Sequence, residues 1–89
     1  MTVSIDPIEV RELVVSAFRE FGAKRDELDQ LSETLLIQAG RYYGRSYRTE
    51  EFLAMWMPDV GIVQFYSADG AMLRTVNLFT ELTPVRQAA

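Results

Sequence analysis

The sequence predicts a single α+β domain, with a helical hairpin and a short third helix followed by an antiparallel β-hairpin packed on the helices. Three observations support this prediction. Apolar residues recur at helical spacing in the first half of the chain, β-branched and aromatic residues gather in the second half, and an Asp-Gly pair separates two apolar runs there. The 89 residues suffice for one hydrophobic core, so we assign the domain to residues 1–80 and a disordered tail to residues 81–89.

The first helix is expected over residues 7–21. Asp6 suits the N-cap, Pro7 suits the first helical position, and Glu9 has the spacing of a capping box. The apolar residues that follow fall on one stripe of the helix: Val10, Leu13, Val14, Ala17, Phe18 and Phe21. Gly22 is suited to ending the helix, because glycine adopts the left-handed backbone conformation at little cost.

A second helix is expected almost directly after the first. One face of it would carry Leu28, Leu31, Leu35, Ala39 and Tyr42. Gly40 lies inside this pattern, at a cost of about 1 kcal/mol relative to alanine, and Gly44 would end the helix. Because the link between the two helices is short, we expect an antiparallel helical hairpin.

Residues 49–57 leave two interpretations open. Thr49 is followed by two glutamates, as at a helix start, and Pro58 would end the helix. The strand alternative is based on alternating apolar residues, namely Leu53, Met55 and Met57. We favour a short helix here.

The last third of the chain predicts a β-hairpin around the turn Asp69-Gly70. If Tyr66 lies opposite Met72, the register places Ile62 opposite Val76. Both faces of such a hairpin carry apolar residues, and an isolated two-stranded sheet is marginally stable at best. We therefore expect helices on one face and a partner on the other, or a second chain paired to its edge.

This expectation leads to the main functional hypothesis, a non-enzymatic protein–protein interaction module that self-associates through the β-hairpin. The partner would be a second copy, giving a homodimer, or an unknown protein. The candidate interface residues are Trp56, Ile62, Tyr66, Met72 and Val76. Aromatic and methionine residues at such spacing also fit a core, and their exposure decides between core and interface.

Residues 41–48 suggest an alternative function. They hold three arginines and three tyrosines and no acid, in a chain of formal net charge −4. On a continued helix the arginines would align at offsets of 4 and 3, as an anion, nucleotide or nucleic-acid contact. The candidate contact residues are Arg41, Tyr42, Arg45, Tyr47 and Arg48. The plainer interpretation is that these arginines interact with the helix dipole and with the chain's own acids. The rest of the chain is acidic and would repel nucleic acid, so nucleic acid is disfavoured as a partner outside this segment.

The sequence contains no histidine and no cysteine. This composition excludes His- or Cys-ligated zinc and the nucleophile systems that need either residue, so we predict no enzyme, no cofactor and no metal. No apolar run approaches the roughly 20 residues of a membrane-spanning helix. The segment Met1–Pro7 lacks the basic and apolar regions of a signal peptide, so we expect a cytoplasmic protein without membrane contact.

Three stretches of the second half resemble the C-terminal part of a family of small bacterial proteins of unknown function. They are Ala54-Met55-Trp56, Val60-Gly61-Ile62-Val63-Gln64-Phe65-Tyr66 and Met72-Leu73-Arg74-Thr75-Val76-Asn77-Leu78. The resemblance covers under half of the chain. It implies a bacterial origin and no activity, ligand or site residue.

Overall fold

Helix α1 spans Pro7–Phe21 in the computed structural model, which describes residues 5–81 of the chain. The carboxylate of Asp6 caps this helix and accepts a hydrogen bond of 2.9 Å from the backbone N–H of Ile8. Gly22 ends the helix with a left-handed φ of 112°. The predicted first helix is therefore confirmed at both ends.

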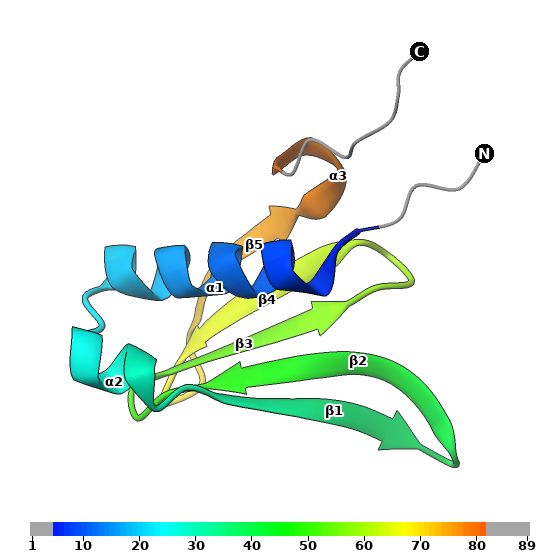
Figure 1. The fold of residues 1–89 in the computed structure, drawn as a ribbon, viewed down its shortest axis with the longest axis horizontal. Coiled ribbons are helices and arrows are strands. Elements are labelled where there is room, and N and C mark those ends of the chain that lie inside the picture. Colours follow the sequence, from blue (N-terminus) through cyan, green and yellow to red (C-terminus); the bar gives the residue numbers. More distant parts are fainter. Residues whose placement is uncertain (1–4, 82–89) are drawn as a thin grey trace.

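The predicted helical hairpin is wrong. Helix α2 is a short element, Arg25–Asp29, and the residues expected to complete a second helix form two strands, β1 (Ser32–Gln38) and β2 (Arg41–Arg48) (Figure 1). Ala39 and Gly40 connect these strands, with positive φ values of 54° and 78°. Two successive residues of positive φ are typical of the tightest hairpin turns, so Gly40 serves a turn here and does not interrupt a helix.

The short helix favoured for residues 49–57 is also wrong, and the strand alternative is confirmed. Strand β3 spans Phe52–Met57 and pairs with β2 on one side and β4 on the other. Thr49 begins no helix; its hydroxyl accepts a hydrogen bond of 3.1 Å from the backbone N–H of Phe52 in the turn that leads into β3.

The predicted β-hairpin is present as β4 (Ile62–Ser67) and β5 (Met72–Asn77), and Tyr66 lies opposite Met72 as expected. The rest of the predicted register is wrong, because Leu73 has no partner and forms a β-bulge. Ile62 consequently pairs with Asn77, and Val76 pairs with Val63 on the other face. Helix α3, Leu78–Glu81, follows directly. Of the tail predicted at residues 81–89, residues 82–89 lie outside the described range.

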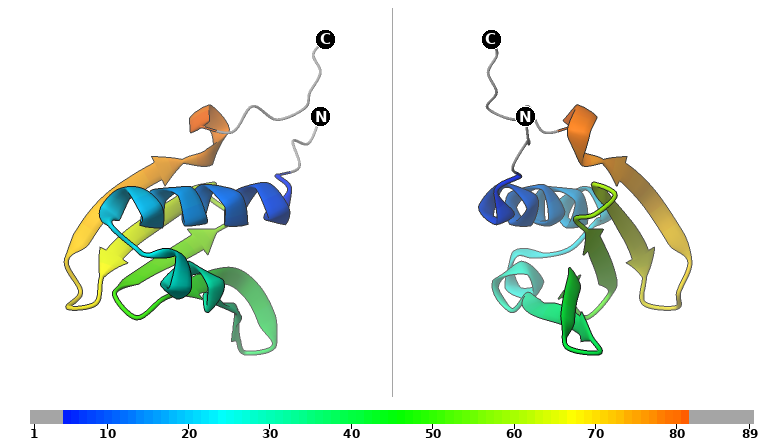
Figure 2. Two further views of the ribbon diagram at one scale, coloured as in Figure 1. Left: turned by 60° about the vertical axis from the view of Figure 1, so that its left-hand side comes forward. Right: turned by 90° about the vertical axis from the view of Figure 1, so that its right-hand side faces the viewer.

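The five strands form one antiparallel sheet in the order β1-β2-β3-β4-β5, so the predicted two-stranded sheet is corrected to five strands. Helix α1 lies along one face of this sheet (Figure 2). The core between them consists of Val10, Val14, Ala17, Phe18, Ala23, Tyr47, Ala54, Trp56, Val63, Phe65, Val76 and Leu78. No helix in the described part of the chain is both long and apolar enough to cross a membrane.

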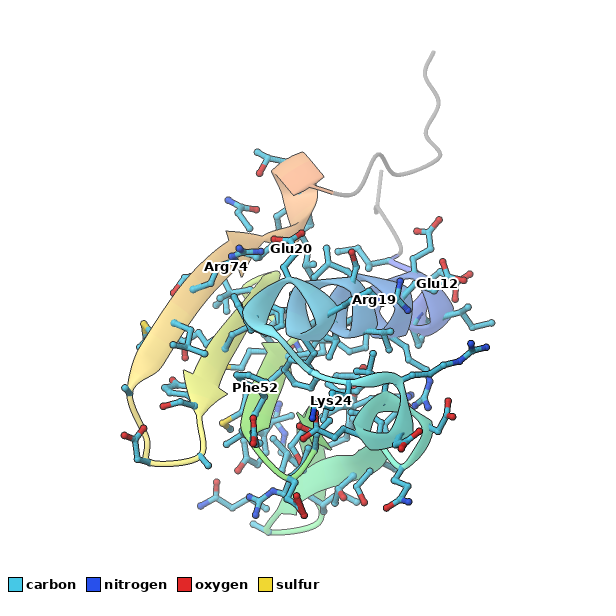
Figure 3. All side chains as sticks on the ribbon, turned by 90° about the vertical axis from the view of Figure 1, so that its left-hand side faces the viewer. Glu12, Arg19, Glu20, Lys24, Phe52 and Arg74 are labelled. Atoms are coloured by element: carbon cyan, nitrogen blue, oxygen red, sulfur yellow. The ribbon has the colours of Figure 1, made fainter. Side chains whose placement is uncertain are left out.

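Aromatic rings and ion pairs fix α1 on the sheet. The rings of Phe18 and Phe21 each lie 5.7 Å from the ring of Phe52, and they approach Phe65 at 5.9 and 5.7 Å. Arg74 of β5 reaches Glu20 of α1 at 3.0 Å (Figure 3), and its guanidinium lies 4.8 Å from the centre of the Phe21 ring. The helix is thereby held over β3, β4 and β5.

Candidate functional site

The side of the sheet opposite α1 is not covered by any helix of the described residues (Figure 2). Side chains alternate along a strand, and the register aligns the outward residues: Leu53 with Tyr66, Met55 with the polar Gln64, Met57 with Ile62, and Tyr66 with Met72. We call this surface the open face and define it by Leu53, Met55, Met57, Ile62, Tyr66 and Met72. Met72 is 54% exposed and the other five are half-buried.

Three of the chain's four methionines lie on the open face, and the fourth, Met1, lies outside the described residues. Methionine is flexible and polarisable, so it adapts to an irregular partner surface. A shallow hollow of about 430 Å³ lies at one end of the open face, where Leu53, Met55 and Tyr66 line it beside Arg48 and Glu50. The open face is thus mainly apolar and adaptable, with Arg48 and Glu50 at its margin.

Acidic side chains are absent from the open face. Among the 13 acids of the chain, Glu33 is the only one within the five strands. Its carboxylate lies on the α1 side, where it binds Arg11 of α1 at 2.7 Å. The remaining acids of the described residues are in helices and turns.

The structure divides the interface residues predicted from the sequence between two places. Ile62, Tyr66 and Met72 lie on the open face, whereas Trp56 and Val76 are buried in the core with 4% and 8% exposure. Val76 faces the core because of the bulge at Leu73, which no residue pattern in the sequence indicates. Leu53, Met55 and Met57 were missed as surface residues because a helix was expected there, although their alternation was the signal that could have identified them.

The segment 41–48 forms strand β2 and no helix, so its arginines do not align on one helical face. Arg45 and Arg48 are three residues apart in a regular stretch of strand and point to opposite faces of the sheet. Arg41 is exposed next to the β1–β2 turn, and Tyr47 is fully buried. The structure therefore separates the predicted cluster and brings only Arg45 and Tyr42 into contact.

Arg45 is the centre of a polar cluster on the α1 side of the sheet. Its Nη1 lies 2.5 Å from Glu33, which also binds Arg11, and its Nε donates over 3.4 Å to the hydroxyl of Tyr42. The guanidinium lies over the Trp56 ring, 5.8 Å from its centre. The hydrogen bonds that Arg45 donates to Tyr42 and Glu33 raise the pKa of Arg45 above its ordinary value.

Two polar atoms near this cluster have no hydrogen-bond partner among the described residues: the Tyr47 hydroxyl and the Trp56 indole N–H. Burial raises the pKa of Tyr47 to about 12, and the carboxylate of Glu33 adds to this shift. The hydroxyl of Tyr47 is consequently protonated throughout the physiological range. An unpaired buried polar group destabilises the fold, so these two atoms need an explanation.

Comparisons of the chain with models of known protein families, with curated proteins and with solved structures found no match in any of the three. The resemblance to a small bacterial family, noted in three stretches of sequence, has no matching family model behind it.

Proposed function

We propose that the protein is a non-enzymatic interaction module that forms a homodimer through the open face. The observation that carries this proposal is the row of six apolar side chains on a sheet face that the described helices leave uncovered. Antiparallel sheets with one face in water normally present polar residues there. An apolar face of this kind is typical of a surface that a partner covers.

Charge supports a second copy as the occupant. The chain has a formal net charge of −4 and its acids occupy the helices and turns, so most contacts between two copies would bring like charges together. The open face contains no acid, and a two-fold axis through it would place identical apolar rows against each other. The Arg48 side chains at its margin can remain in water.

The face is favoured over the hairpin edge as the site of self-association. The free edge of the hairpin is β5, and this strand is bulged at Leu73. Bulges disrupt the row of backbone groups that a new strand would need, and natural sheets use them to prevent edge pairing. The proposal places the dimer in the cytoplasm, which the absence of cysteine supports.

The test is the solution mass of the wild type and of two variants by analytical ultracentrifugation. Met55→Glu introduces a charge at the centre of the open face and should yield a folded monomer. Ile8→Glu is the matched control, because Ile8 is 65% exposed on α1, away from the proposed interface, and this variant should remain a dimer. A wild type that stays monomeric at high concentration would refute the proposal.

The second candidate function, anion or nucleotide binding by residues 41–48, retains specific support only at Arg45. Arg45 and Arg48 lie on opposite faces, so a single polyanion cannot contact both in the way that one helical face would allow. Nucleic acid is accordingly a disfavoured partner for this acidic chain.

A further inference from the structure

A second surface of interest is a pocket of about 380 Å³ on the α1 side of the sheet, where β2 and β3 meet the start of α1. Its apolar walls are Ile5, Pro7, Pro58 and Phe79. Its polar side chains are Tyr42, Arg45 and Trp56. The volume lies within the range of small-molecule sites, roughly 300–1,000 Å³, and the combination of an apolar wall with a few polar groups is typical of them.

The polar groups of the pocket are hydrogen-bond donors with unused capacity. Arg45 commits its Nε to Tyr42 and its Nη1 to Glu33, and its Nη2 has no partner among the described residues. The Tyr42 hydroxyl accepts from Arg45, so its own proton is available for donation. Trp56 also lines the pocket, but its indole N–H is buried without a partner among the described residues, so we do not count it among the donors that a ligand can reach. Arg45 Nη2 and the Tyr42 hydroxyl could therefore both donate to an acceptor bound in the pocket.

The net charge of the side chains around the pocket suits a ligand with a single negative charge. Two guanidinium groups, Arg11 and Arg45, share the one carboxylate of Glu33, which leaves a net charge of +1. Asp6 precedes the pocket residue Pro7, but its carboxylate is turned to the backbone N–H of Ile8 as the cap of α1. Asp59, which follows the pocket residue Pro58, is exposed. A phosphate dianion would exceed the charge that a single uncompensated guanidinium can neutralise.

We propose that this pocket binds a small monocarboxylate with a flat apolar body. The carboxylate would accept from Arg45 Nη2 and from the Tyr42 hydroxyl. The apolar body would lie against Pro7, Pro58 and Phe79, beside the ring of Trp56. The site lies on the α1 side of the sheet, so its occupancy does not depend on self-association through the open face.

Trp56 is the only tryptophan of the chain, so two signals report this pocket directly. Titration with phenylacetate, monitored by Trp56 fluorescence and by the indole N–H resonance in NMR spectra, should give saturable changes in both. Phenylacetamide has the same body without the charge and should bind at least tenfold more weakly. The proposal would be overturned if no saturable change appeared up to about 10 mM phenylacetate, a concentration well above the dissociation constants of weak specific ligands. Equal binding of phenylacetamide would overturn it too.

Three variants locate the bound carboxylate. Arg45→Gln should abolish binding of phenylacetate, and Tyr42→Phe should weaken it about tenfold through the loss of one charge-assisted hydrogen bond. Arg41→Gln removes an exposed arginine of the same strand that does not line the pocket, and it should bind like the wild type. Tyr42→Phe removes a single exposed hydroxyl and keeps the ring, so it provides the test if Arg45→Gln fails to fold. Unchanged binding by Tyr42→Phe together with weaker binding by Arg41→Gln would contradict the assignment.

Discussion

The two faces of the sheet are built from alternate residues of the same strands, yet they differ in composition and packing. Under α1, residues such as Ala54, Val63 and Phe65 are fully buried and belong to one core with the apolar residues of the helix. On the open face, Met55 and Ile62 alternate with them and remain half-buried at most. The comparison separates two roles, because the covered face stabilises the fold and the open face is available to a partner.

The largest expected difference between the faces concerns neighbouring aromatic residues of β4. Phe65→Ala should lower the free energy of unfolding by about 3–5 kcal/mol, because it leaves a cavity beside Phe18 and Phe21. Tyr66→Ala on the open face should cost about 1 kcal/mol. Urea unfolding of both variants in the Met55→Glu background measures these costs without a contribution from the proposed dimer. Equal costs would mean that the open face is packed as tightly as the core.

The buried hydroxyl of Tyr47 predicts a loss of stability at alkaline pH. Burial raises its pKa from 10.0 to about 12 in the folded protein. Below pH 10 Tyr47 is protonated in both the folded and the unfolded protein, so it does not make the free energy of unfolding depend on pH. Between pH 10 and 12 the unfolded state loses the proton first, so stability should fall by up to about 3 kcal/mol.

Tyr47→Phe should remove that alkaline contribution. At neutral pH the variant should be as stable as the wild type or about 1 kcal/mol more stable, since the hydroxyl has no partner among the described residues. Thermal unfolding from pH 8 to pH 11 compares the two proteins. If Tyr47→Phe is clearly less stable at neutral pH, the hydroxyl makes a favourable hydrogen bond and the interpretation of Tyr47 is wrong.

A smaller effect is expected from the ion pairs that join α1 to the sheet. Glu33 is 24% exposed and binds both Arg11 and Arg45, so Glu33→Gln should cost about 1–2 kcal/mol. Glu20 is 59% exposed in its pair with Arg74, and Glu20→Gln should cost less than about 0.5 kcal/mol. Unfolding at low and high salt tests the order, and a larger effect at Glu20 would contradict it.

The elements that could be predicted from the sequence were those with local signals. α1 has a capping residue, an apolar stripe and a terminal glycine, and the β4–β5 hairpin has an Asp-Gly turn. The β1–β2 hairpin lacks such a signal, because its turn is Ala39-Gly40 and Leu28, Leu31 and Leu35 have helical spacing by coincidence. A turn with alanine at positive φ is uncommon, so the helical interpretation prevailed.

The candidate sites could be predicted only in part from the sequence. Tyr42 and Arg45 were identified through their residue types, but their contact depends on the pairing shift opposite Leu36 and Ile37, which leaves Tyr43 without a partner and brings Tyr42 to the face of Arg45. Bulges of this kind are set by tertiary packing and leave no local pattern. The apolar second face of the hairpin was expected, whereas its extension across β3 required the strand order.

The measurement that tests the central claim most directly is an isotope-filtered NOE experiment on a mixture of methionine-methyl-labelled and unlabelled protein. The open-face dimer predicts intermolecular NOEs from the methyls of Met55 and Met57 to Ile62 and Tyr66 of the second copy. A homodimer whose intermolecular NOEs arise elsewhere, or a protein that gives none at high concentration, would contradict self-association through the open face.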